Sequence, residues 1–110
     1  MSDRVLLCIP NLLLASQVRA ALAVTGHEVR SASVENVCEL MAEPWHLVIA
    51  DLSALGPGAC GEFPAIPEET RGVGLITHQD VLLRPRWEAV GFQVVFRRDF
   101  FSEMEKYLFP

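Results

Sequence analysis

The most constraining feature of the sequence is its alternation between short apolar runs and segments with helical periodicity. The run Leu47–Ala50 (LVIA) is apolar at every position, which is typical of a strand buried on both faces of a parallel sheet. Similar runs occur at 4–9, 72–77 and 93–97, and polar–apolar alternation at 27–32 is typical of an edge strand. Such alternation predicts a parallel sheet with helices on both faces, joined by right-handed crossovers.

Capping residues predict where three helices begin. Asn11 is expected to cap the first helix, and Gly26 to close it. Ser33 is expected to cap a second helix, whose inward-facing stripe includes Cys38. Asp99 is expected to cap the last helix. The segment LGPGACGEFPAIPEET, residues 55–70, contains three prolines and predicts a short turn or loop in place of a regular third helix.

The connection before the last strand is also interrupted by proline. Pro85 predicts an irregular lead-in followed by a short helix that ends before Gly91. The whole chain is expected to be one domain, 1–110, with its five strands in the order 2-1-3-4-5, a doubly wound α/β fold. Ligands in such sheets bind at the carboxyl ends of the strands, where Asp51 follows Ala50.

Composition argues against several classes of function. The net charge of −5 disfavours nucleic acid as a partner, because phosphate binding needs clustered basic residues. The apolar runs are too short to span a membrane, and the first residues do not resemble a secretion signal. The three cysteines form no C-x-x-C pair, so neither disulfides nor a zinc site is predicted, and a cytoplasmic location fits best.

Over essentially its whole length the chain resembles the receiver domain of two-component response regulators, the CheY-like family. In that family an aspartate ending the third strand accepts a phosphoryl group, and VIADLS places Asp51 there. Thr77 in GLITH matches the Thr or Ser that ends the fourth strand. In VVFRRDF, Arg98 stands where the family has a lysine, with Arg97 one residue out of register. The resemblance implies a flavodoxin-like fold.

The sequence departs from the receiver pattern after the first strand. Receivers carry two acids there that hold magnesium, and the matching residues here are Ile9 and Pro10. Magnesium requires several oxygen ligands in near-octahedral geometry, which Asp51 and one carbonyl cannot supply. Without the metal, charge developing on a phosphoryl group has too little compensation. The chain is therefore interpreted as a degenerate pseudo-receiver, with no catalytic residue, metal site or cofactor.

Two interpretations of Asp51 remain open. In the structural one, Asp51 forms an internal ion pair with Arg98 or accepts hydrogen bonds from Thr77 and the backbone. In the alternative, it serves an atypical phosphoreceiver or a small enzyme at the strand ends. Two weaker candidates are Cys8 as a phosphocysteine nucleophile and a metal site built from Cys8, Asp51 and His78.

The expected function is that of a non-catalytic protein–protein interaction module in signal transduction. Unless the chain is a fragment of a longer protein, no output domain is expected after Phe109 and Pro110, so the partner is expected in trans, with a homodimer as one form. The expected interface is the face formed by the helix after Pro85, the strand at 93–97 and the last helix. Its candidate residues are Trp87, Phe92, Phe96, Arg97 and Phe101.

Overall fold

The computed structural model describes residues 3–56 and 63–109, and these residues form one five-stranded sheet. Every neighbouring pair of strands is parallel, and the strand order is β2-β1-β3-β4-β5. In chain order the strands are β1 (Arg4–Cys8), β2 (Glu28–Ser31), β3 (Leu47–Asp51), β4 (Arg71–Ile76) and β5 (Phe92–Phe96). This is the doubly wound, flavodoxin-like α/β topology that the sequence predicts.

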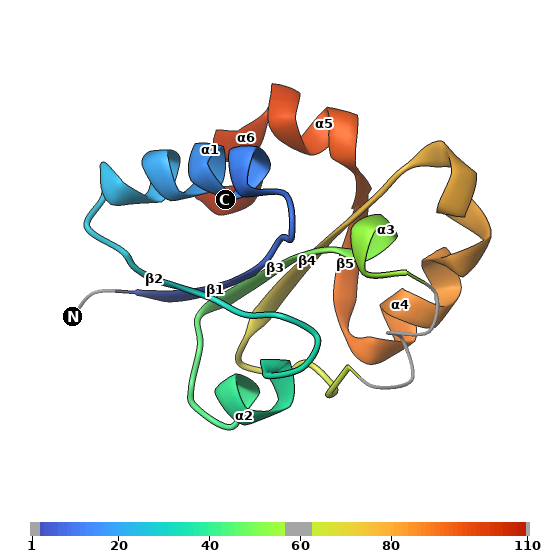
Figure 1. Ribbon diagram of the computed structural model, residues 1–110, viewed down its shortest axis with the longest axis horizontal. Helices are drawn as coiled ribbons and strands as arrows, with labels where there is room; N and C mark the ends of the chain where they lie inside the picture. Colours follow the sequence, from blue (N-terminus) through green and yellow to red (C-terminus); the bar gives the residue numbers. More distant parts are fainter. Residues whose placement is uncertain (1–2, 57–62, 110) are drawn as a thin grey trace.

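Helices cover both faces of the sheet. They are α1 (Leu12–Ala23), α2 (Val37–Met41), α3 (Leu52–Leu55), the 3-10 helix η2 (His78–Leu83), α4 (Arg84–Val90), α5 (Arg97–Ser102) and α6 (Met104–Leu108). Figure 1 shows α1, α5 and α6 on one face and α2 and α4 on the other. Of the helices in the described ranges, none is long and apolar enough to cross a membrane.

The core consists of two apolar layers, one on each face of the sheet. Leu6 and Cys8 belong to the layer under α2, α3 and α4, whereas Val5 and Leu7 belong to the layer under α1, α5 and α6. This division follows from the strand geometry, because successive side chains point to opposite faces. The same alternation determines which side chains meet at the ends of the strands.

Several predicted helix boundaries are confirmed. The Asn11 side chain accepts hydrogen bonds from the backbone N–H groups of Leu13, at 2.9 Å, and Leu14, at 3.1 Å, and so caps α1. Pro85 lies in the first turn of α4, after the irregular segment η2. Gly91 follows α4 with φ of +118°, a left-handed conformation that glycine adopts without a steric penalty.

The prediction for the second helix is wrong at its start. The Ser33 backbone N–H donates to Asn36 Oδ1 at 2.7 Å, and the Ser33 hydroxyl contacts the same oxygen at 3.2 Å. This local bonding competes with helix formation, so α2 begins only at Val37. Cys38, predicted to face inward, is exposed, and Leu40 packs into the core instead.

The last helix also differs from its prediction. It begins at Arg97, directly after β5, and not at a cap formed by Asp99. Glu103, with φ of −131° and ψ of 44°, separates it into α5 and α6. Phe100 and Leu108, one on each helix, both pack against the sheet.

The described part of the connection between β3 and β4 contains one short turn of helix, α3, which directly follows β3 and precedes most of the segment 55–70. Residues 57–62 of the predicted irregular segment lie outside the described residues. Residues 63–70 contain no helix. They are held in part by a backbone hydrogen bond of 2.9 Å from Ile66 N to Val90 O.

Candidate functional site

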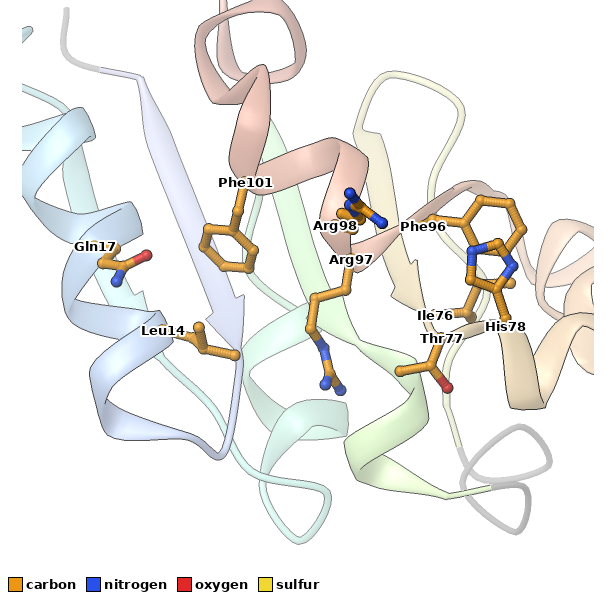
Figure 2. A pocket seen from close by; sticks show the side chains of 9 residues that line it. All are labelled: Leu14, Gln17, Ile76, Thr77, His78, Phe96, Arg97, Arg98 and Phe101. Carbon is orange, nitrogen blue, oxygen red and sulfur yellow. The ribbon is translucent and has the colours of Figure 1, made fainter.

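The carboxyl ends of three neighbouring strands bring Asp51, Thr77 and Arg97 to the same face of the sheet. In the strand register Asp51 lies beside Leu75, and Leu75 lies beside Val95. Thr77 comes two positions after Leu75, and Arg97 comes two positions after Val95. Side chains two positions apart along a strand share a face. Figure 2 shows Arg97 reaching across this edge with Thr77 beside it.

An ion pair joins Asp51 to Arg97. Arg97 Nη2 lies 2.9 Å from Asp51 Oδ1; the exposed fraction of the side chain is 1% for Asp51 and 33% for Arg97. Asp51 Oδ1 also accepts a long hydrogen bond, 3.4 Å, from the backbone N–H of Ala54 in α3. Asp51 Oδ2 and Arg97 Nε are both buried and have no hydrogen-bond partner among residues 3–56 and 63–109.

Arg98, the predicted partner of Asp51, does not make this contact. Arg97 continues the alternation of β5 and therefore points to the face of Asp51. Arg98 lies in the first turn of α5 and is exposed to solvent. The prediction that Asp51 has an internal arginine partner holds, but the arginine assigned to it was wrong.

Thr77 is close to the pair but does not bind it in the predicted way. Among the described residues, no hydrogen bond joins Asp51 to the Thr77 side chain. The backbone N–H of Thr77 instead donates to the Ser53 hydroxyl at 2.8 Å. Sequence reasoning missed Ser53, although its position two residues after Asp51 places it in the same turn.

The structure does not favour Cys8 as a nucleophile. Cys8 packs with Ala50 in the layer opposite Asp51. Burial, with a smaller contribution from Glu35, raises the pKa of the Cys8 thiol to about 11. The thiolate needed for nucleophilic attack is therefore scarce at neutral pH. Within the described ranges, no group of three His, Cys, Asp or Glu residues could hold a metal ion.

We expect Cys8 to resist alkylation in the folded protein. At neutral pH, iodoacetamide should modify Cys8 at least about 100-fold more slowly than the exposed Cys38, because Cys8 is both buried and protonated. Peptide mass spectrometry after timed quenching measures both rates. In guanidinium chloride the two rates should become similar. Rapid modification of Cys8 in the folded protein would contradict this assignment.

Two residues of the predicted interface lie in the core. Trp87 is 0% exposed and Phe92 is 3% exposed. Their rings pack edge to face at 5.8 Å between centroids, and both contact Phe63. The prediction that they form a partner surface is wrong, because α4 turns Trp87 toward the sheet. Phe96 and Phe101 are only partly buried.

A cavity of about 380 Å³ lies between α1, the end of β4 and the start of α5. Figure 2 labels its nine lining residues. Leu14, Gln17 and Phe101 lie on one side of the two arginines, and Thr77 and His78 lie on the other. The cavity therefore joins three segments that are far apart in the sequence.

Large apolar side chains are also exposed outside the cavity, and four of them form two adjacent pairs. In η2 the exposed fractions are 42% for Val81 and 88% for Leu82. In the first turn of α1 they are 84% for Leu12 and 67% for Leu13. Sequence reasoning did not single out either pair.

Comparisons of this chain with models of protein families, with curated proteins and with solved structures found no match.

Proposed function

We propose that this chain is a pseudo-receiver, a non-catalytic protein–protein interaction module in signal transduction. The observation that carries the proposal is the state of Asp51. In the proposed resemblance its carboxylate corresponds to a receiver's phosphoacceptor, and in the structure this side chain is 1% exposed and pairs with Arg97. A carboxylate in this state is a structural group and is poorly accessible to a phosphodonor.

The surroundings of Asp51 also disfavour phosphoryl transfer. Ile9, at one position of the missing acidic pair, is 7% exposed and packs in the apolar layer of α1 and α5. Pro10, at the other position, has no side-chain oxygen. Magnesium prefers hard oxygen ligands and tolerates little distortion, so this arrangement is a poor magnesium site.

The interaction surface in this proposal is the exposed side of η2 and the adjoining end of β5. Val81 and Leu82 project from η2 into solvent. His78, at the start of η2, stacks on Phe96 with ring centroids 4.1 Å apart. These side chains replace Trp87 and Phe92 as the apolar part of the surface. A protein partner binds here in trans, and a homodimer is its simplest form.

The proposal predicts association that does not depend on phosphorylation. Sedimentation of the purified chain should show a dimer, and acetyl phosphate with magnesium should change neither the association nor the intact mass. The reason is that Asp51 is 1% exposed, whereas the exposure of Val81 and Leu82 does not depend on any change at Asp51. The double variant Val81→Asp, Leu82→Asp should sediment as a monomer, because a charge within an apolar interface is costly to desolvate.

The matched control is the variant Leu12→Asp, Leu13→Asp, which makes the same change at the other exposed apolar pair. It should remain a dimer. A monomeric parent chain, or equal effects of the two double variants, would contradict the proposed surface. A mass increase that Asp51→Asn abolishes would instead favour the alternative, an atypical phosphoreceiver that uses Asp51.

A further inference from the structure

We propose that the cavity between α1, the end of β4 and α5 binds a small apolar carboxylic acid as its anion. Its volume of about 380 Å³ lies within the range of small-molecule sites. The cavity lies at the carboxyl edge of the sheet, where parallel α/β proteins place their ligands. His78 and Phe96 belong both to this cavity and to the proposed interaction surface, but the variants that test the cavity, at Arg98 and Gln17, lie outside that surface, so the two proposals can fail separately.

The body of the ligand must be apolar. The cavity is lined by Leu14, Ile76, Phe96 and Phe101 and by five polar or charged residues, but nearly all of its wall surface is apolar. Leu14, Phe96 and Phe101 are partly exposed, so some of their apolar surface is in contact with water. A ligand that covers this surface gains free energy at about 25 cal/mol per Å² of apolar area.

The charge of the cavity favours an anion. No Asp or Glu is among the lining residues, although the whole chain carries a net charge of −5. The guanidinium of Arg97 is already compensated by Asp51 at 2.9 Å. Arg98 lines the same cavity, is exposed, and forms no ion pair within residues 3–56 and 63–109. It is thus an uncommitted positive group at the rim.

One uncommitted guanidinium matches one carboxylate. The planar guanidinium can donate two parallel hydrogen bonds to the two oxygens of a carboxylate. A dianionic phosphate ester would leave a second charge beside Leu14 and Phe101, where no further cation compensates it. A neutral apolar ligand would gain no charge interaction with Arg98, which is exposed to water. The combination favours a monocarboxylate on an apolar body.

The test compares naphthoate with its neutral analogue naphthamide in amide chemical-shift titrations of the full chain. Naphthoate should shift resonances of residues that line the cavity, and naphthamide should bind about tenfold more weakly. Arg98→Gln should reduce naphthoate affinity about tenfold and leave naphthamide unchanged. Arg86→Gln, which removes the same charge at an exposed position of α4 outside the cavity, should have no effect.

A second variant tests the cavity itself without altering the core. Gln17 is exposed on α1 and lines the cavity, so Gln17→Trp should fill the space and abolish the binding of both compounds. Equal affinities for the two compounds, or an Arg98→Gln variant that binds naphthoate like the parent, would overturn the proposal. Absence of binding, or shifts confined to residues away from the cavity, would overturn it as well.

Discussion

Replacing Trp87 by alanine is expected to lower the free energy of unfolding by about 3–5 kcal/mol. Trp87 is fully buried, and its ring packs against those of Phe63 and Phe92, each at 5.8 Å between centroids. Truncation removes these contacts and leaves a cavity that a close-packed core fills only partly. Urea denaturation followed by far-ultraviolet circular dichroism measures the loss. Since small domains are stable by only about 5–15 kcal/mol, the variant should be close to unfolding.

The control for this measurement is Leu12→Ala, at a position that is 84% exposed and lies outside the proposed interaction surface. Its free energy of unfolding should stay within about 0.5 kcal/mol of the parent. Trp87→Ala with unchanged stability but altered self-association would place Trp87 at the surface and contradict its assignment to the core. The comparison matters because a Trp87 variant that unfolds would also lose partner binding, for reasons unrelated to an interface.

The sheet could be predicted from the sequence because its signals are local. Fully apolar runs such as Leu47–Ala50 specify strands buried on both faces, and the polar second strand, 27–32, specifies an edge. Asn11 caps the helix that directly follows it, and the fixed φ angle of Pro85 suits the first turn of the helix in which it lies. Both effects act only on residues nearby in the sequence. The predicted helix starts at Ser33 and Asp99 were wrong because several neighbouring residues could begin each helix. Side-chain hydrogen bonds or packing determine which residue does.

The prediction of Arg98 as the partner of Asp51 shows the limit of matching by resemblance. Arg97 and Arg98 are adjacent, so a match to the family pattern that can shift by one residue cannot tell which of them takes the position of the family's lysine. Counting by two from Val95 selects Arg97, because strand side chains alternate between faces. The signal was therefore present in the sequence, in the periodicity of β5.

The burial of Trp87 was also encoded locally, whereas the cavity was not. Leu83, Trp87 and Val90 follow the i, i+4, i+7 spacing of a helix face that packs inward, and all three contact one core layer. The cavity instead depends on how closely α1 approaches α5, and so on side chains as distant as Leu14 and Phe101. Spacing along the chain carries no information about such an approach.

The two members of the buried ion pair are expected to differ in what their removal costs. Arg97→Met leaves the carboxylate of Asp51 at 1% exposure with no cation beside it, so we expect a loss of about 3–5 kcal/mol. Asp51→Asn leaves Arg97, whose side chain is 33% exposed and can turn toward water, so we expect about 1–3 kcal/mol. The double variant should lose less than the sum, with a coupling of about 0.5–3 kcal/mol. Urea denaturation of the parent chain and the three variants completes this cycle.

Arg98→Met, the adjacent control, should change stability by no more than about 0.5 kcal/mol because Arg98 is exposed. An Arg98 variant as destabilised as the Arg97 variant, or a cycle without coupling, would contradict the pairing of Asp51 with Arg97.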